Sequence, residues 1–212
     1  MAPLFSPKAK MVSCDSPPGA AELLWPQERH HIEGAAQGRV DDFVAGRWCA
    51  HRALEALGER PVAIGVGERR QPLWPKTVVG AITHTKGLAA AVVAYRHDLA
   101  SVGIDVEPDL PLPPKVDHRI IRPEEMDQLT KAPGNGLANP DRVIFSAKES
   151  IYKAWYPLAQ RWLGFEDAIV EFQTNENTFH ATILVDGPLS VVNGRYRIRN
   201  GFVITSVEVP SG

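Results

Sequence analysis

The stretch Phe145-Ser-Ala-Lys-Glu-Ser-Ile-Tyr-Lys-Ala-Trp-Tyr-Pro157 predicts a helix with one apolar face and one charged face. Glu149 and Lys153 are four residues apart, so they lie on a common helix face about one turn from each other, with Lys148 beside them. We expect the helix to run from about Asp141 to Trp155. Apolar residues recur at steps of three and four, as an amphipathic helix requires; they are Ile144, Ala147, Ile151, Ala154 and Leu158.

This stretch alone leaves two interpretations open. A carboxylate flanked by two lysines beside a buried stripe is a candidate for holding phosphate and metal together. The same spacing also describes an ordinary surface ion pair, worth about 0.3–0.5 kcal/mol. We expect Pro157 to disturb the helix and Gly164 to mark its end.

A second stretch, Ser101-Val-Gly-Ile-Asp-Val-Glu-Pro108, alternates apolar and polar residues and predicts a strand. Asp105 and Glu107 therefore point to the same side. Two like charges so placed repel unless a cation lies between them, and carboxylate oxygens suit Mg²⁺. The alternative is the solvated polar face of an edge strand. Gly103 fits a close approach by a ligand or by another backbone.

Composition indicates an ordinary soluble globular protein, because 44% of the 212 residues are apolar and 23% are charged. The formal net charge of −2 gives no overall field that favours nucleic acid or an anionic membrane. The two cysteines are too few for a disulfide scaffold, which favours a reducing cytoplasm. No apolar run approaches the roughly 20 residues of a membrane helix, the start lacks the apolar core of a signal peptide, and no internal repeat is evident.

The first half of the chain predicts one long helix and a hairpin. The helix should run from about Ile32 to Leu57, with Arg39 and Arg47 two turns apart on similar sides. The hairpin should have a four-residue connection, 84–87, with His84 at its tip. The remaining expectations are a mostly irregular segment over 1–30 (with a turn at Ser16-Pro-Pro-Gly19), a strand over 62–66, a loop over 68–75, and hairpin strands over 78–83 and 88–95.

The second half follows a proline-rich crossing, 108–114, and again combines helix with strands. Asn200-Gly201 is a strong signal for a type I′ hairpin turn. The overall class is therefore α+β. The expected elements are a short helix over 123–130, a loop over Pro133–Gly136, the organising helix, and strands over 165–172, 178–185, 195–199 and 202–207.

Taken together, the two chemical stretches resemble the 4′-phosphopantetheinyl transferases. Their pattern is G-[IV]-D-x-E followed by W/F-x-x-K-E-[AS]-x-x-K, and the pair at this separation is specific. Other segments are similar to the Sfp-type branch, and most of all to its actinobacterial members, mycobacterial enzymes included. These segments are Arg47-Trp-Cys-Ala50, Gln71-Pro-Leu-Trp-Pro75, Ile82-Thr-His84 and Arg161-Trp-Leu-Gly-Phe165. Residues 1–30 and 108–140 match poorly.

The resemblance implies a pseudo-dimer of two similar α+β halves, each a long helix on a small antiparallel sheet, with residues 1–107 and 108–212 as the halves. It implies coenzyme A in the cleft between them as co-substrate. The phosphopantetheine arm would pass to a serine of an apo acyl carrier or peptidyl carrier domain of fatty acid, polyketide or nonribosomal peptide synthases, leaving adenosine 3′,5′-bisphosphate. It also implies a cytoplasmic monomer that binds neither nucleic acid nor membrane.

The resemblance also assigns site residues, by their positions in the motifs of the family. The resemblance implies that Asp105, Glu107 and Glu149 bind Mg²⁺, or Mn²⁺, and that Asp105, Glu149 and Lys153 are catalytic. Glu149, or a metal-linked water, would take the proton of the attacking serine. The residues implied to bind coenzyme A are Arg39, Arg47, Arg69, Thr83, His84, Lys148 and Lys153, with Lys86 as a weaker candidate.

Two other functions fit the same residues. One is a Mg²⁺-dependent diphosphate hydrolase that acts on coenzyme A with water as nucleophile. The other is a non-catalytic coenzyme A binding protein, which the presence of both Asp105 and Glu149 disfavours. A requirement for a carrier domain in coenzyme A turnover separates the first from the transferase.

Overall fold

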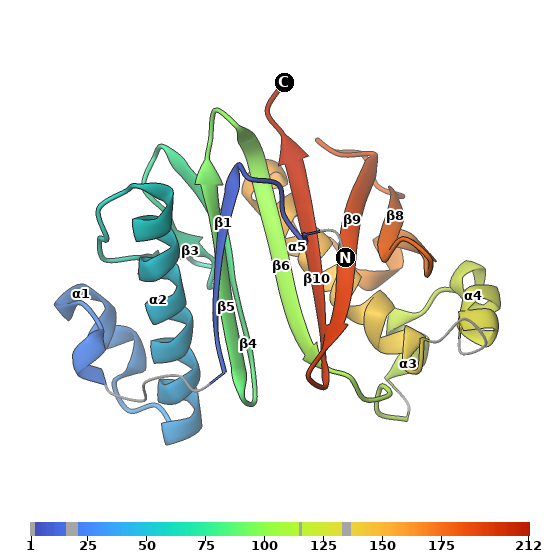
Figure 1. Ribbon diagram of the computed structural model, residues 1–212, viewed down its shortest axis with the longest axis horizontal. Helices are drawn as coiled ribbons and strands as arrows, with labels where there is room; N and C mark the ends of the chain where they lie inside the picture. Colours follow the sequence, from blue (N-terminus) through green and yellow to red (C-terminus); the bar gives the residue numbers. More distant parts are fainter. Residues whose placement is uncertain (1–2, 16–20, 115, 133–136) are drawn as a thin grey trace.

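Two antiparallel sheets lie side by side in the computed structural model, each with one long helix against it (Figure 1). The structure describes residues 3–15, 21–114, 116–132 and 137–212. The first sheet has the order β1-β5-β4, with β1 Ala9–Cys14, β4 Val78–Thr85 and β5 Leu88–Tyr95. The second has the order β6-β10-β9-β8-β7, with β6 Leu99–Pro108, β7 Ala168–Gln173, β8 Thr178–Ile183, β9 Val191–Arg199 and β10 Phe202–Pro210. The α+β class is confirmed.

The long helices are α2, Gln37–Leu57, on the first sheet and α5, Pro140–Ala159, on the second. In Figure 1, α5 lies behind β6 and β10. Two short strands, β2 Gly65–Val66 and β3 Pro72–Leu73, pair with each other. The shorter helices are η1 Ala21–Leu23, α1 Pro26–Arg29, η2 His30–Ile32, α3 Asp117–Ile120, η3 Pro123–Glu125, α4 Met126–Lys131 and η5 Phe165–Asp167. Among the described residues no helix is both long and apolar enough to span a bilayer.

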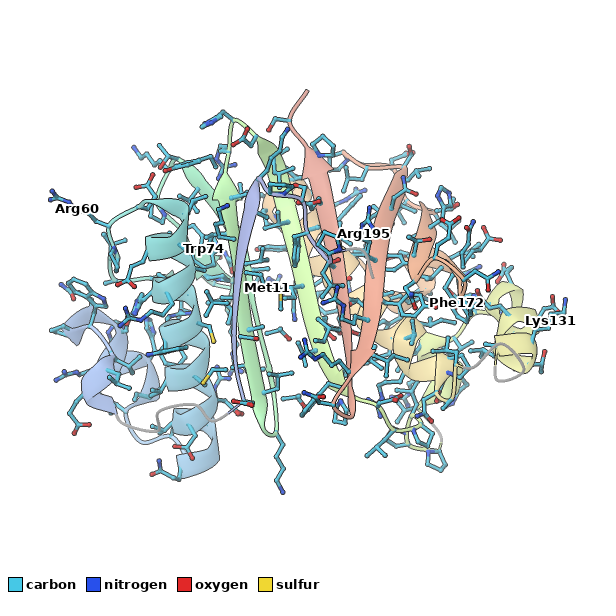
Figure 2. The ribbon with its side chains drawn as sticks, in the orientation of Figure 1. Met11, Arg60, Trp74, Lys131, Phe172 and Arg195 are labelled. Carbon is cyan, nitrogen blue, oxygen red and sulfur yellow. The ribbon has the colours of Figure 1, made fainter. Side chains whose placement is uncertain are left out.

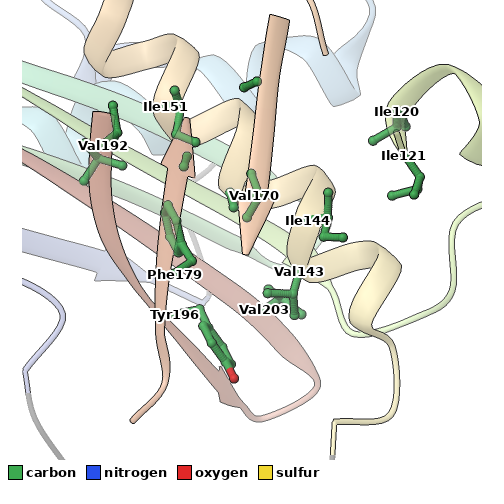
Figure 3. Close-up of a cluster of buried hydrophobic side chains, with 14 of the residues drawn as sticks. Ile120, Ile121, Val143, Ile144, Ile151, Val170, Phe179, Val192, Tyr196 and Val203 are labelled. Carbon is green, nitrogen blue, oxygen red and sulfur yellow. The ribbon is translucent and has the colours of Figure 1, made fainter. Parts of the chain in front are cut away.

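The apolar stripe of α5 is the centre of the second half's core, as its spacing predicts. Ile144 and Ile151 are fully buried and belong to one apolar cluster with Val170, Phe179 and Val203 (Figure 3). Gly103 of β6 shows how closely helix and sheet approach, because a Cβ there would overlap the backbone oxygen of Ser150. The close neighbour expected at Gly103 is therefore the α5 backbone.

The end of α5 differs from the prediction. The helix continues through Pro157, which is exposed, and ends at Gln160, which adopts a left-handed conformation with φ 52°. The N–H of Gln160 donates to the carbonyl of Tyr156 at 2.9 Å and so closes the last turn. Gly164 therefore does not end this helix. Glycine is the usual residue at a left-handed cap, and Gln160 takes this conformation at the cost that a Cβ atom imposes.

The N-terminal segment contains a strand that the sequence analysis missed. Residues 9–14 pair antiparallel with β5, and Met11 (labelled in Figure 2) packs against the apolar cluster that includes Val102 and Ile104 of β6. The segment over 1–30 is thus not mostly irregular, because tertiary pairing with β5 overrides its weak local pattern. Ser16–Gly19 and the predicted loop Pro133–Gly136 lie outside the described residues.

The hairpin of β4 and β5 has a tighter turn than predicted. The strands extend to Thr85 and from Leu88, so only Lys86 and Gly87 connect them, and Gly87 has φ +87°. His84 therefore lies within β4, paired with Ala89, and not at the tip. The helix expected from Ile32 begins at Gln37, and the strand expected over 62–66 is only β2.

The strands of the second half are close to their predicted places. Asn200 and Gly201 have φ values of 52° and 78°, as a type I′ turn between β9 and β10 requires. The short helix predicted over 123–130 is present as η3 and α4. β7 begins only at Ala168, because η5 precedes it.

The two sheets meet along β4 and β6, and this seam defines the position of the site. β4 lies against β6, yet the two strands belong to separate hydrogen-bonded sheets. At the seam the hydroxyl of Thr83 accepts the N–H of Val106 at 3.2 Å and donates to Asp105 Oδ1 at 3.1 Å. The Thr83 side chain thus makes a hydrogen bond to the β6 backbone next to the Asp105 carboxylate.

Two fully buried glutamates reveal an internal correspondence that was not evident from sequence. Glu28 accepts the N–H of Trp25 at 3.0 Å, and Glu125 accepts the N–H of Arg122 at 2.8 Å, each three residues back. Each also binds a basic side chain 23 residues later on the long helix, His51 on α2 and Lys148 on α5.

The correspondence extends to a third contact. Glu28 accepts the N–H of Ile64 at 2.8 Å, and Glu125 accepts the N–H of Val170 at 2.8 Å. The sequence signal is short, namely Trp25-Pro-Gln-Glu28 and Arg122-Pro-Glu-Glu125. The two halves therefore use the same device to fasten a short helix to a long one.

Candidate active site

Asp105 is the centre of the site. It lies on β6, is only 4% exposed, and its two oxygens accept three hydrogen bonds. Oδ1 accepts from Thr83 at 3.1 Å and from Lys153 Nζ at 2.7 Å, and Oδ2 accepts from Ser146 at 2.9 Å. β4, β6 and α5 therefore converge on one carboxylate.

Glu149 and Glu107 lie near Asp105, and their surroundings disfavour the ionised form of each carboxyl group. Burial raises the pKa of Glu149; Lys153 opposes that rise, and Asp105 adds to it. Burial and the neighbouring Asp105 raise the pKa of Glu107 to about 7, although Arg142 contacts it at 2.9 Å. The three predicted metal ligands thus share a region with excess negative charge.

The donor chemistry of this region fits Mg²⁺, because all three groups offer hard carboxylate oxygens. Among the described residues, however, no group of three or more His, Cys, Asp or Glu side chains is close enough to hold a metal ion. Lys153 supplies the positive charge beside Asp105 in this arrangement. Glu107 and Glu149 would therefore have to come closer to Asp105 to hold a metal with it.

The raised pKa of Glu107 predicts that the free energy of unfolding depends on pH. The folded protein binds this proton more tightly than the unfolded chain, so stability is lost as the pH rises from the ordinary glutamate pKa of 4.5 through about 7. We expect Glu107→Gln to raise the free energy of unfolding by about 1–2 kcal/mol at about pH 8 and to change it little near pH 4. Urea unfolding with EDTA at both pH values measures this. The exposed Glu171→Gln is the matched control, and an equal stabilisation at both pH values would contradict the prediction.

A cavity of about 450 Å³ opens beside these carboxylates. It lies between β3 and β4 on one side and α5 on the other, and its lining is mostly apolar with cations at the edges. Its lining residues are Arg69–Trp74, Val79–Ile82, Arg96, Glu149, Tyr152, Lys153, Tyr156, Pro157 and Gln160.

A smaller cavity of about 130 Å³ adjoins it, because Arg70, Pro72 and Ile82 line both. Arg39, Arg47 and His84 line this smaller cavity, so the structure brings these three predicted residues together. His84 Nδ1 lies 3.5 Å from Asp42. The two cavities share these lining residues and together make one candidate cleft, in which Glu149 and Lys153 line the larger cavity and Arg39, Arg47 and His84 line the smaller.

Arg47 is an unusual buried cation. It is 5% exposed, its guanidinium stacks over Phe43 at 4.5 Å, and Nη2 donates to Gly65 O at 3.3 Å. Its Nε lies 3.7 Å from Glu28 and has no hydrogen-bond partner within the described residues. Burial lowers the pKa of Arg47 to about 10, with Glu28 opposing and Arg39 adding to the change. Arg39, Arg47 and Arg70 line the smaller cavity together with one carboxylate, Asp42, so its lining carries a net positive charge.

Two predicted coenzyme A ligands have other partners. Lys148 is 4% exposed, and its ammonium donates to Ile120 O at 2.7 Å, Glu125 at 2.9 Å and Phe165 O at 2.9 Å. An ammonium has three N–H donors, so none remains for a phosphate, and the structure does not support that role. The Thr83 hydroxyl is likewise occupied by Asp105 and Val106, so Thr83 supports the carboxylate.

Of the other predicted residues, one lies at the cleft and one lines neither cavity. Arg69 lines the larger cavity, and Lys86 is exposed in the β4–β5 turn. Residues missed from sequence include Ser146 and Arg142, which bind Asp105 and Glu107, and Trp74 and Tyr152, which line the larger cavity. Ser146 and Tyr152 lie within the two-faced helix and Trp74 lies within the segment Gln71–Pro75, and these positions are the sequence signals for them.

Comparison with known proteins agrees with this geometry. Residues 27–94 match the 4′-phosphopantetheinyl transferase N-terminal domain, and residues 101–204 match the 4′-phosphopantetheinyl transferase superfamily. The chain is 43% identical to the 4′-phosphopantetheinyl transferase Npt of Nocardia iowensis, over 86% of this chain and 87% of that protein. The chain belongs to the 4′-phosphopantetheinyl transferases.

Two further relatives have similar coverage. PptT of Mycobacterium tuberculosis is 39% identical over 90% of this chain and 87% of its own length. Svp of Streptomyces mobaraensis is 39% identical over 93% of this chain and 84% of its own length. Both are named 4′-phosphopantetheinyl transferases. The predicted resemblance to the actinobacterial branch is confirmed.

Proposed function

We propose that this protein transfers the phosphopantetheine arm of coenzyme A to a serine of an apo carrier domain and releases adenosine 3′,5′-bisphosphate. The observation that carries the proposal is the cleft itself. A basic cavity with Arg39, Arg47 and His84 adjoins a larger cavity whose lining includes Glu149 and Lys153. Such a cleft suits an extended molecule with a phosphate monoester at one end and a diphosphate near its centre.

Different residues of the site would carry out different parts of the reaction. The reaction breaks the coenzyme A diphosphate, so negative charge grows on the leaving phosphate, and Lys153 is placed to stabilise it. A divalent cation held by Asp105, Glu107 and Glu149 would neutralise further phosphate charge. Burial raises the pKa of Glu149 and makes it a better acceptor for the serine proton than an exposed carboxylate. Mg²⁺ and Mn²⁺ both fit this donor set.

The internal correspondence supports the further proposal that the chain is a pseudo-dimer of two halves, 1–107 and 108–212. Glu28 and Glu125 fasten equivalent helices in the two halves with equivalent contacts. β6 precedes the proposed boundary but pairs with β10, so it links the halves. Since the pairing of halves is internal, we propose a monomer. Two free cysteines fit a cytoplasmic location.

The direct test is the intact mass of an apo carrier protein after incubation with this protein, coenzyme A and Mg²⁺, with an EDTA control. A gain of one phosphopantetheine, lost with EDTA, is the expected result. Cleavage of coenzyme A without a gain across several carrier classes would indicate the hydrolase instead. Tight binding with neither outcome would indicate a binding protein.

Arg47 gives a second prediction. We expect Arg47→Ala to raise KM for coenzyme A at least tenfold and to affect dephospho-coenzyme A much less, because only the former carries the phosphate that would pair with the guanidinium. Steady-state kinetics with both substrates measure the difference. An equal loss for both substrates would place Arg47 away from that phosphate. Arg52→Ala, on the same helix and half-exposed, is the control.

A further inference from the structure

Glu28 is a buried carboxylate beside the smaller cavity that the mechanism does not use. It is fully buried, and its Oε1 is close to three donors: His51 Nε2 at 3.0 Å, Ile64 N at 2.8 Å and Arg47 Nε at 3.7 Å. Burial acts to raise its pKa, but the bonds from His51 and Ile64 outweigh this and leave the pKa lowered. Glu28 is therefore an anion in the folded protein.

Three contacts fix the guanidinium of Arg47. Phe43 supports its face, Gly65 O accepts from Nη2, and Glu28 lies on the Nε edge. Two of these contacts depend on Glu28, because Glu28 also anchors the strand segment that leads from Ile64 to Gly65. A guanidinium recognises a phosphate best when its fork is fixed in advance.

From this geometry we propose that Glu28 is a positioning residue for phosphate-monoester recognition: it orients Arg47 so that its fork faces the smaller cavity. The inference rests on the proposed function, since it assigns the 3′-phosphate of coenzyme A to that cavity. Glu28 contacts no substrate and acts through Arg47.

The internal correspondence supplies a matched control. Glu125 is equally buried and makes the equivalent backbone contacts in the second half, but its basic partner Lys148 lies outside the smaller cavity. Glu28→Gln and Glu125→Gln should therefore lower the melting temperature to a similar extent. Only Glu28→Gln should change how the protein distinguishes two substrates that differ in one phosphate.

The experiment measures kcat/KM for coenzyme A and for dephospho-coenzyme A with wild type, Glu28→Gln and Glu125→Gln. We expect Glu28→Gln to reduce the preference for coenzyme A about tenfold, through KM, and Glu125→Gln to leave the preference unchanged. In an Arg47→Ala background, Glu28→Gln should have no further effect on the preference. Calorimetric binding of adenosine 3′,5′-bisphosphate and of AMP gives the same comparison without turnover.

Several outcomes would overturn the inference. One is a loss of stability in Glu28→Gln with an unchanged or increased preference, which would make Glu28 purely structural or a competitor of the phosphate. Another is an additive effect in the Arg47→Ala background. If Glu28→Gln is insoluble, Glu28→Asp is the alternative, because it keeps the negative charge but moves the carboxylate away from Arg47. This variant must still reduce the preference for coenzyme A over dephospho-coenzyme A. Failure of the proposed function is distinguishable, because wild type would then show no transfer or no preference at all.

Discussion

Glu149→Gln is expected to reduce kcat for carrier modification by on the order of a thousandfold while the protein stays folded. Glutamine keeps the size of the side chain and removes both the charge and the ability to accept a proton. Burial and the neighbouring Asp105 both raise the pKa of Glu149, so the ionised form is costly in the free protein. The substitution should therefore leave the melting temperature unchanged or raise it.

The measurement combines intact-mass kinetics on an apo carrier with thermal unfolding of the same sample. Glu171→Gln is the control, because Glu171 is an exposed glutamate on β7 far along the sheet from β6. Near-normal turnover by Glu149→Gln would remove Glu149 from the reaction. A lowered melting temperature would show that Glu149 stabilises the fold, and the kinetic loss would then no longer indicate catalysis.

The sequence was most informative where chemistry and periodicity coincide. Asp105, Glu149 and Lys153 lie on a strand and a helix with clear spacing, and the structure brings them together across 48 residues between Asp105 and Lys153. The same spacing predicted a coenzyme A contact for Lys148, whose ammonium has protein partners in this structure, because adjacent helix positions differ by about 100° and face different surroundings. Its partner Glu125 is distant in sequence, so no local pattern could show that the ammonium is occupied.

Other features depend on contacts that a local pattern does not encode. β1 forms a strand because it pairs with the edge of β5. α2 begins later than predicted, and Ile32 belongs instead to the short helix η2. The correspondence of Glu28 and Glu125 rests on a four-residue signal with two identities, which is too short to stand out. In each case the deciding partner is far along the chain.

The buried pair of Glu125 and Lys148 predicts the largest effect on stability. Both side chains are at most 2% exposed, and Nζ lies 2.9 Å from Oε2. Glu125→Ala would leave the Lys148 ammonium without its counter-ion and would also deprive Arg122 N and Val170 N of an acceptor. We expect the free energy of unfolding to fall by about 3–5 kcal/mol, because a buried unpaired charge cannot recover its hydration.

An exposed ion pair serves as the control that separates the effect of burial on stability from the effect of charge pairing alone. Lys131 and Asp127 lie 2.6 Å apart with side chains 70% and 75% exposed, so Asp127→Ala should change stability by at most about 0.5 kcal/mol. Urea unfolding of both variants measures the contrast. Lys148→Met together with Glu125→Ala should cost less than the sum of the single changes, because the second substitution removes the charge that the first leaves unpaired. Strict additivity would mean that the two groups do not stabilise each other, and that each serves only its backbone partners.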